Sequence, residues 1–295
     1  MRRRSDLPAY LALRAAVAPL LALPRGAALG TGAALGRLAR RPFGLRRAVA
    51  DQNLALAFPE LSRDARDAIC VGMYEHFGRM SVDTFRSGTT AGREVLPLMH
   101  ADREVALLQD LLRRGRGLLA LTGHLGNWEA GIPFLARHGM PVTAVWKPQT
   151  NPWMAGYFDR LRRGLGLETI PMPEARWGVP AALRAGRIVA LAADQYSIRG
   201  DTRVPFFGRL TRTFEGPGHF AAQTGAPVVV GAIFSDGDGG YRVAVEVLDE
   251  APRGEPEELV PRIATLYRAA LEGLIRTAPE QYLWTHHLWR EGLQP

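Results

Sequence analysis

His124 and Glu129 are the two residues whose types and spacing point most directly to chemistry. The apolar run 118–121 predicts a short buried strand, two glycines after it predict a turn, and Asn127 is a good N-cap for a helix that follows. We therefore expect His124 in a loop and Glu129 in the first helical turn. In α/β proteins, the loops that follow strand ends carry binding and catalytic groups.

The turn decides whether these two side chains can meet. On one continuous helix, residues five apart point about 140° away from each other. With a turn between them, the Glu129 carboxylate can accept the proton on the far ring nitrogen of His124, which fixes the tautomer and raises the basicity of the imidazole. A histidine held in this way is a general base for an incoming hydroxyl. A solvated or capping histidine is the competing interpretation.

A second stretch repeats the arrangement. Asp194 and Gln195 follow the apolar run 190–193, where they either line a pocket or cap the next loop. Arg162, on an Arg-rich helix, either holds an anionic head group or is solvated.

These segments resemble a known family over most of the chain: the bacterial late acyltransferases of lipid A biosynthesis and their relatives that acylate phosphatidylinositol mannosides. This family is a branch of the lysophospholipid acyltransferases with an H-x4-D/E signature. The similar segments are 123–129, 147–153, the Asp194-Gln195 pair, 204–208 and 279–286.

The resemblance implies that His124 deprotonates an acceptor hydroxyl and that Glu129 orients it. The hydroxyl then attacks an acyl thioester carried by acyl carrier protein or coenzyme A, with no metal and no further cofactor. One departure is Trp146-Lys147-Pro148, where family members commonly show Tyr-Arg-Pro, and Lys lacks the bidentate geometry of Arg toward phosphate. We expect the substrate site to include Asn127, Trp128, Lys147, Arg162, Asp194 and Gln195. Trp128, Phe206 and Phe207 are candidates for shaping a hydrocarbon groove.

Composition limits the remaining possibilities. The 295 residues, 47% of them hydrophobic, suffice for one large domain, and a single Cys excludes a disulfide framework. The net charge of +8 is carried almost wholly by Arg, which suits an anionic membrane surface, a phosphorylated lipid or an acidic carrier protein. No zinc-finger, RNP or basic-helix signature is present, which argues against nucleic acid. No spacing of His or Cys predicts a metal site.

The first forty residues are apolar but interrupted. Charged residues and prolines break the stretch from Leu7 to Leu38, so that no uncharged run reaches the roughly 20 residues of a bilayer span. We expect residues 1–45 to be a membrane-associating helical segment that lies on, or half-inserts into, the cytoplasmic face of the inner membrane. Glycines four apart, Gly26 with Gly30 and Gly32 with Gly36, allow close approach of helix backbones there.

The rest of the pattern predicts a single α/β domain over 46–295, with a central mixed sheet flanked by helices. The resemblance implies that this is an acyltransferase domain, similar to those of glycerolipid acyltransferases. A helical cap covers 46–100, the α/β core covers 101–250, and a C-terminal helix with an aromatic tail covers 251–295. Expected strands are 118–122, 142–146, 168–170, 188–193, 227–234 and 241–248. Expected helices are 64–86, 102–114, 127–138, 152–164, 176–185, 216–224 and 256–278.

The sequence therefore predicts a membrane-bound O-acyltransferase that acylates a glycolipid such as a lipid A precursor. Phosphatidylinositol mannoside and a lysophospholipid remain alternative acceptors. A lipid hydrolase with the same pair, a non-catalytic membrane-bound lipid-binding protein and an Arg-rich nucleic-acid binder remain alternative functions, although no G-x-S-x-G elbow is present for a serine esterase.

Overall fold

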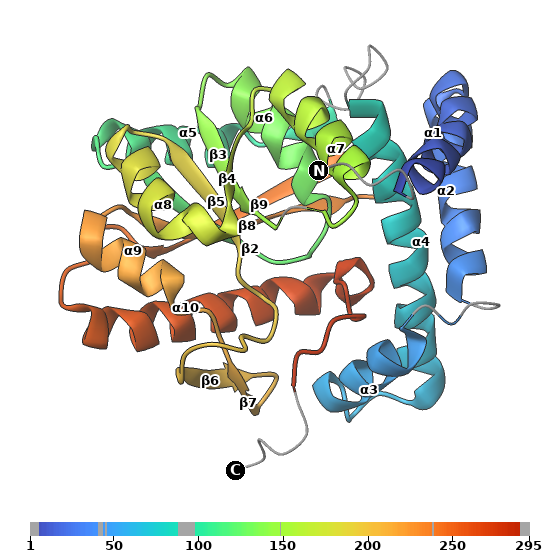
Figure 1. The fold of residues 1–295 in the computed structure, drawn as a ribbon. Helices are drawn as coiled ribbons and strands as arrows, with labels where there is room; N and C mark the ends of the chain where they lie inside the picture. The colour runs from blue at the N-terminus through green and yellow to red at the C-terminus, as the bar shows by residue number, and fades with distance from the viewer. Residues whose placement is uncertain are drawn as a thin grey trace.

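A mixed sheet forms the centre of the molecule (Figure 1). The structure is a computed structural model that describes residues 6–40, 44, 46–87, 98–147, 149–237 and 239–289. In this part of the chain the large sheet consists of β1 (Met99–His100), β2 (Leu118–Thr122), β3 (Val142–Trp146), β4 (Glu168–Pro171), β5 (Ile188–Ala192), β8 (Val228–Ser235) and β9 (Tyr241–Asp249). Their order is β1-β9-β8-β2-β5-β3-β4. From β8 to β4 all strands are parallel, and β9 is antiparallel to β8.

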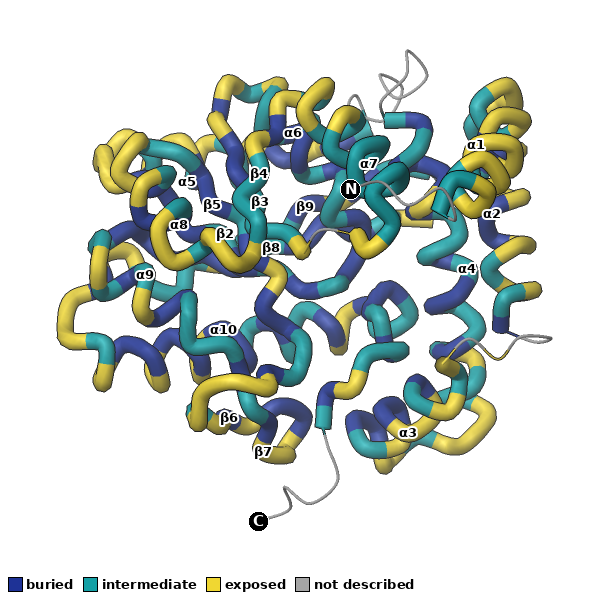
Figure 2. The backbone as a smooth tube through the Cα atoms, viewed as in Figure 1, coloured by how far each residue is buried: buried dark blue, intermediate teal, exposed yellow. Residues whose placement is uncertain are grey.

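Helices cover both faces of this sheet. The helices of the described residues are α1 (Leu7–Ala22), α2 (Arg25–Arg40), α3 (Arg47–Ala57), α4 (Arg63–Ser87), α5 (Asp102–Arg113), α6 (Gly131–Arg137), α7 (Pro152–Gly164), α8 (Ala175–Arg184), α9 (Gly216–Thr224) and α10 (Pro256–Thr277). Of these, α1, α2 and α3 pack on α4 at the side of the molecule (Figure 1). The main core lies between the sheet and α8, α9 and α10, whereas α5 and α6 pack on the opposite face in smaller clusters. The central strands β2, β5 and β8 are mostly buried, and Figure 2 shows the outer turns of α1 and α2 exposed.

The two faces of the central strands differ. In β2, Leu119 and Leu121 are buried in the main core, while Ala120 and Thr122 on the other face are only partly buried. This alternation follows from the two-residue period of a strand. One face of the sheet is therefore packed solid, and the other leaves space beneath α5 and α6.

The strand register brings the two chemistry-bearing stretches together. β2 and β5 are parallel neighbours, and Thr122 pairs with Ala192 at their carboxyl ends. His124 and Asp194 each lie two residues beyond this pair, so the fold places them side by side at the same edge. β8 and β3 lie on opposite sides of the β2–β5 pair. In α/β sheets, a crevice forms at the carboxyl ends of the strands where the chain connections turn to opposite sides.

The N-terminal helices pack on the rest of the protein through glycine. A Cβ on Gly36 of α2 would lie 2.0 Å from the carbonyl oxygen of Tyr74 on α4, and a Cβ on Gly78 would lie 2.1 Å from the carbonyl oxygen of Gly32. Nothing lies within 4 Å of a Cβ on Gly26 or Gly30. The expected close approach is thus confirmed for Gly32 and Gly36 and wrong for the other two. Among the described residues, no helix has the length and apolarity to cross a membrane.

Most of the predicted elements are confirmed within one or two residues, including the β8–β9 hairpin and the long last helix. The helix expected over 127–138 begins as a 3₁₀ turn, Trp128–Ala130, and Asn127 caps it by accepting a hydrogen bond from the Ala130 N–H. The hairpin of β6 (Arg203–Phe206) and β7 (Arg209–Arg212) was not predicted from the sequence. The division of the chain at residues 45 and 100 stays a prediction, and 41–43, 45 and 88–97 lie outside the described residues.

The close α2–α4 contact predicts that Gly36→Ala destabilises the protein while Gly30→Ala does not. The new methyl group of Gly36→Ala meets a backbone carbonyl that cannot move away, so we expect a loss of about 1–3 kcal/mol in the free energy of unfolding. Gly30→Ala on the same helix meets open space. Thermal unfolding midpoints of the two purified variants make the comparison, and equal midpoints would contradict this packing.

Candidate active site

His124 is held by a buried carboxylate, which is that of Asp194. His124 Nδ1 lies 2.8 Å from Asp194 Oδ1, and the backbone N–H of His124 donates to Asp194 Oδ2 at 2.9 Å. Because a carboxylate only accepts, the proton sits on Nδ1 and leaves Nε2 unprotonated. The Asp194 side chain is 2% exposed, and that of His124 is 24% exposed.

The two groups shift each other's ionisation. Burial alone would lower the pKa of His124, but the charge and hydrogen bond of Asp194 raise it above 6.5. Burial alone would raise the pKa of Asp194, but His124 and Arg268 lower it to about 2. Asp194 therefore stays ionised at neutral pH and stabilises a proton taken up by His124.

Arg268 of α10 holds the backbone on the other side of this carboxylate. Arg268 is 1% exposed, and its guanidinium donates to the carbonyl oxygens of Asp194 at 2.7 Å and Gln195 at 3.2 Å. Tyr267, beside it, donates to the carbonyl of Thr122 at 2.7 Å. Neither residue was predicted as a site residue. The available signal was an arginine on the apolar face of an amphipathic helix, since such a cation must find acceptors in the interior.

Glu129 has a different partner from the one expected. Its carboxylate accepts from Arg162 Nε at 3.2 Å and from Nη2 at 2.5 Å. The expected hydrogen bond from His124 to Glu129 is wrong, because the single Nδ1 proton of His124 is already donated to Asp194. Arg162 is half-buried on α7, and the helical turn that starts after Asn127 places Glu129 within reach of its guanidinium. The catalytic role of Glu129 stays a prediction.

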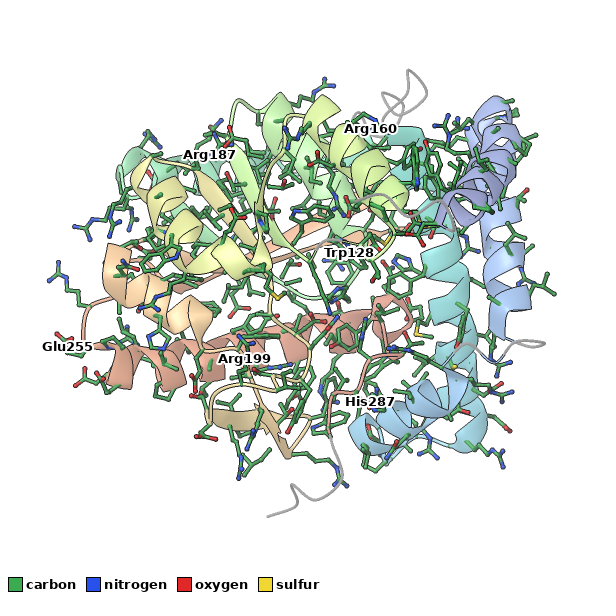
Figure 3. All side chains as sticks on the ribbon, in the orientation of Figure 1. Trp128, Arg160, Arg187, Arg199, Glu255 and His287 are labelled. Atoms are coloured by element: carbon green, nitrogen blue, oxygen red, sulfur yellow. The ribbon has the colours of Figure 1, made fainter. Side chains whose placement is uncertain are left out.

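The other predicted site residues divide into two groups. Trp128 contacts the His124 ring at 5.1 Å between centroids, and Gln195 Nε2 lies 3.5 Å from His124 Nε2. Lys147 lines the same cavity from an exposed position. Asn127 does not line it; it is buried, and its amide donates to the hydroxyl of Tyr241. Figure 3 shows Trp128 near the centre of the molecule.

His286 was missed by the sequence prediction. It lies in the C-terminal segment that follows α10, and its ring is 5.4 Å from that of His124 across the same cavity. Burial and the nearby His124 lower the pKa of His286 to about 4, so it is neutral at physiological pH. Asn53 of α3 fixes this segment by donating to the carbonyls of Trp284 and His286.

The cavity that His124 faces has a volume of about 560 Å³ and extends along the open face of the sheet. The register places Ala120, Ala190 and Ala144 side by side on β2, β5 and β3, and all three line it. The larger side chains of Ile188 and Val142 line it at the amino ends of β5 and β3, away from His124. Phe206 and Phe207 belong to the main core instead, so their expected part in a groove is wrong.

Comparison of this chain with known proteins identifies its family. A model of the family described as bacterial lipid A biosynthesis acyltransferase matches residues 3–291. The chain belongs to this family. The resemblance inferred from the H-x4-E segment is confirmed, and the protein is an acyltransferase. In the described residues, no group of three or more His, Cys, Asp or Glu is arranged to hold a metal ion.

Two kinds of relative are similar to this acyltransferase. The lipid A biosynthesis lauroyltransferase of Escherichia coli (strain K12) is 28% identical over 273 residues, which cover 88% of this chain and 84% of the relative. The palmitoleoyltransferase of lipid A biosynthesis from the same strain is 26% identical over 266 residues, covering 88% and 83%. The phosphatidylinositol mannoside acyltransferase of Mycobacterium tuberculosis (strain ATCC 25618 / H37Rv) is 29% identical over 186 residues, covering 60% and 58%.

The His124–Asp194 pair predicts the pH dependence of this acyltransferase. Because Asp194 raises the pKa of His124, the unprotonated imidazole predominates only above pH 6.5. We expect the acidic limb of kcat/KM to have its midpoint above that pH. In Asp194→Asn the midpoint should move to lower pH, because the negative charge that raises the His124 pKa is gone. The plateau value of kcat/KM should fall by about 100-fold or more. Steady-state kinetics from pH 5 to 9 measure both.

Glu129→Gln is the matched comparison. In the wild type the Glu129 carboxylate binds Arg162, not His124. We therefore expect the midpoint of the acidic limb in Glu129→Gln to stay at the wild-type pH even though the rate falls. A shift in Glu129→Gln without a shift in Asp194→Asn would reverse the assignment of the partner of His124.

Proposed function

We propose that this protein transfers a fatty acyl chain from an acyl thioester to a hydroxyl of a membrane glycolipid, with His124 as the general base. One observation carries the proposal. His124 has Nδ1 tied to a buried carboxylate, while its ring lines an apolar cavity on the open face of the sheet. A base at the mouth of a hydrocarbon-sized space is the arrangement that acyl transfer requires. The family and its named relatives support the same class of reaction.

In the proposed reaction, His124 Nε2 removes the proton of the acceptor hydroxyl as its oxygen attacks the thioester carbonyl carbon. The C–S bond then breaks, and the departing sulfur receives that proton from Nε2. The products are an ester and a free thiol, and the base returns to its starting state. Asp194 stabilises the imidazolium between the two steps. Gln195, whose amide nitrogen lies 3.5 Å from Nε2, flanks the position of the hydroxyl.

Glu129 and Arg162 enter the proposal as a pair. Arg162 lines the cavity, and its Cζ lies over the Trp146 ring, 5.5 Å from the centroid. Two of its nitrogens donate hydrogen bonds to Glu129. Its remaining N–H groups are directed by this pairing and can donate to the thioester carbonyl oxygen or to a polar group of the acceptor. Glu129 thereby fixes the guanidinium instead of the imidazole.

The cavity is the proposed site of the acyl chain. Its floor is a row of alanine methyls, and small side chains at the middle of a sheet face leave room for a hydrocarbon. The larger side chains of Ile188, Val142 and Leu108 also line it. The chain would lie parallel to the strands with its thioester at their carboxyl ends, beside the base.

A lipid A precursor is the acceptor that we favour, and phosphatidylinositol mannoside is the alternative. The lipid A relatives match 88% of this chain, whereas the phosphatidylinositol mannoside relatives of M. tuberculosis and Mycolicibacterium smegmatis match 60% and 77%. We propose acyl carrier protein or coenzyme A as the donor, because a net charge of +8 suits either acidic thioester. The reaction as proposed needs no metal and no further cofactor.

We also propose that the protein acts on the cytoplasmic face of the inner membrane. Leu11 of α1 is 54% exposed, and Leu35 and Leu38 of α2 are exposed to a similar degree. Exposed leucines beside arginines are the composition of a segment that lies in a bilayer surface.

The first test compares the polar lipids of the native host with those of a strain whose only copy is His124→Ala. We expect one lipid to lose the mass of one acyl chain, because the acceptor hydroxyl is no longer deprotonated. Mass spectrometry of the extracted lipids measures this loss and identifies the acceptor.

His219→Ala is the control, since His219 is an exposed histidine on α9 outside the cavity. Immunoblots of membrane and soluble fractions establish equal abundance of the variants. Identical lipid profiles at equal abundance would overturn the assignment of the base and favour a non-catalytic lipid-binding role.

The row of alanines predicts control of chain length. Ala190→Leu fills the middle of the cavity, so we expect the enzyme to prefer a donor several carbons shorter and to lose most of its rate on the original chain. Competition between thioesters of different length, read by mass spectrometry of the product, measures the preference. The same change at Ala34, an exposed position on α2, should leave it unaltered. An unchanged preference in Ala190→Leu would place the chain elsewhere.

A further inference from the structure

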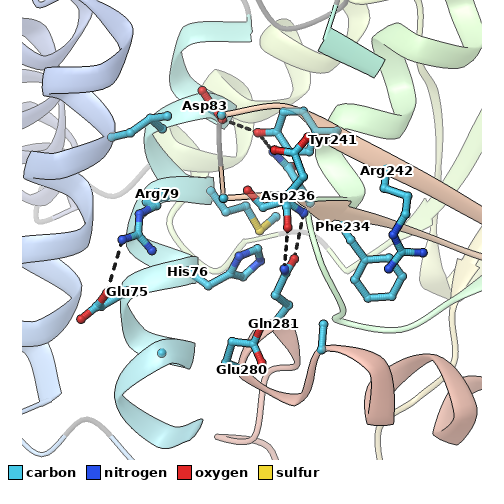
Figure 4. A pocket seen from close by; sticks show the side chains of 18 of the residues that line it. Glu75, His76, Arg79, Asp83, Phe234, Asp236, Tyr241, Arg242, Glu280 and Gln281 are labelled. Carbon is cyan, nitrogen blue, oxygen red and sulfur yellow. Dashed lines mark hydrogen bonds and ion pairs between the residues drawn. The ribbon is translucent and has the colours of Figure 1, made fainter. Parts of the chain in front are cut away.

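A chain of hydrogen bonds, half-buried at Arg25 and buried from Asp83 onward, connects α2 with the loop that carries His124. Arg25 of α2 donates two hydrogen bonds to the carboxylate of Asp83 on α4, at 3.1 and 2.9 Å. It also donates to the carbonyl of Gly239 at 2.6 Å. Tyr241 of β9 donates its hydroxyl to the same carboxylate. Figure 4 shows Tyr241 directed at Asp83 in the wall of a second cavity of about 960 Å³.

The chain ends on Asn127. Its amide nitrogen donates to the hydroxyl of Tyr241 at 3.0 Å, and its side-chain oxygen accepts from the Ala130 N–H. Its backbone N–H donates to Ile233 at 2.7 Å. Asn127 is 2% exposed and stands three residues after His124. The turn between His124 and the following helix is therefore fixed by side chains of α4 and β9 and, behind them, by one arginine of α2.

The remaining contacts of this turn show why the amide matters. Gly126 donates its N–H to the carbonyl of Gln281 at 2.9 Å and has a φ of 62°, and a Cβ there would lie 2.0 Å from the carbonyl of Ile233. Backbone bonds fix the turn at Gly126, and two side chains of the turn reach other elements: His124 reaches Asp194, and Asn127 reaches Tyr241 and, through it, Asp83 and Arg25. Removal of the acceptor at Tyr241 would leave a buried amide unpaired, and the turn must shift to pair it.

We propose that Arg25, Asp83 and Tyr241 are positioning residues that act through Asn127 to hold His124 against Asp194, which makes α2 a part of the catalytic structure. The proposal rests on the proposed function of His124. None of the three residues lines the cavity that His124 faces, so none is proposed to touch the substrate. Displacement of a catalytic group by about 1 Å costs up to 100-fold in rate, so a network this close to the base has a measurable effect.

The chain offers a matched control. Arg37 also joins α2 to α4, through Glu75 at 2.8 Å, but its side chain is 59% exposed and the described contacts do not continue from this pair to the turn. Arg37→Gln and Arg25→Gln therefore each remove one ion pair between the same two helices. Only Arg25→Gln disturbs the path to Asn127.

The experiment measures kcat/KM against pH for the full-length enzyme and for Arg25→Gln, Arg25→Lys, Tyr241→Phe, Arg37→Gln and His124→Ala. We expect Tyr241→Phe and Arg25→Gln to lower the plateau about tenfold. Their acidic limb should move to lower pH, toward that of Asp194→Asn, because a looser His124–Asp194 bond raises the His124 pKa less. Arg25→Lys should recover part of the rate, and Arg37→Gln should match the wild type. Asp194, His286 and Glu129, the titratable neighbours of His124 in the site, are unchanged in the Arg25 and Tyr241 variants.

The pH midpoint separates positioning from simple loss of folded protein, which lowers the rate equally at every pH. Tyr241→Phe with an unchanged midpoint, or Arg25→Gln equal to Arg37→Gln, would overturn the positioning role. If His124→Ala retained full activity, the proposed function itself would fail. An inactive His124→Ala beside a fully active Tyr241→Phe would overturn only the present inference.

Discussion

The ionised carboxylate of Asp194 is the constraint on which the site depends. A buried carboxylate is tolerated only when its oxygens accept hydrogen bonds. Here His124 donates both its backbone N–H and its ring N–H to Asp194, and Arg268 donates to the Asp194 carbonyl. These partners come from the ends of two neighbouring strands and from the middle of α10. The same contacts therefore stabilise the core and orient the His124 ring, and the site cannot loosen without exposing an unpaired charge.

The sequence predicted the sheet well because its strands are short apolar runs separated by glycine and helical periodicity, a pattern that reports burial directly. It also located His124, since a histidine after a strand and before a helix N-cap is a local signal. The partner of His124 was not predictable in this way. Seventy residues separate Asp194 from His124, and only the pairing of β2 with β5, in register at Thr122 and Ala192, makes them neighbours.

The misassigned Glu129 shows the same limit. Spacing along the chain favoured a His–Glu contact, but the choice was decided by Arg162 on another helix, which competes for the carboxylate. His286 and Arg268 escaped prediction for a related reason: one lies in an irregular segment whose path is fixed by Asn53, and the other is a cation on an apolar helix face. Local pattern identifies groups that can do chemistry, whereas long-range packing decides which of them act on each other.

The unequal faces of the sheet have an evolutionary consequence. Stability resides on the side of α8, α9 and α10, where the side chains interlock, and the hydrocarbon-sized space resides on the side of α5 and α6. Substitutions in the row Ala120, Ala190 and Ala144 alter the space without touching the interlocked face. With the acyl chain in this cavity, as proposed, a change of chain-length preference requires no change in the interlocked face, so that members of one family could differ by a few carbons and still share a fold.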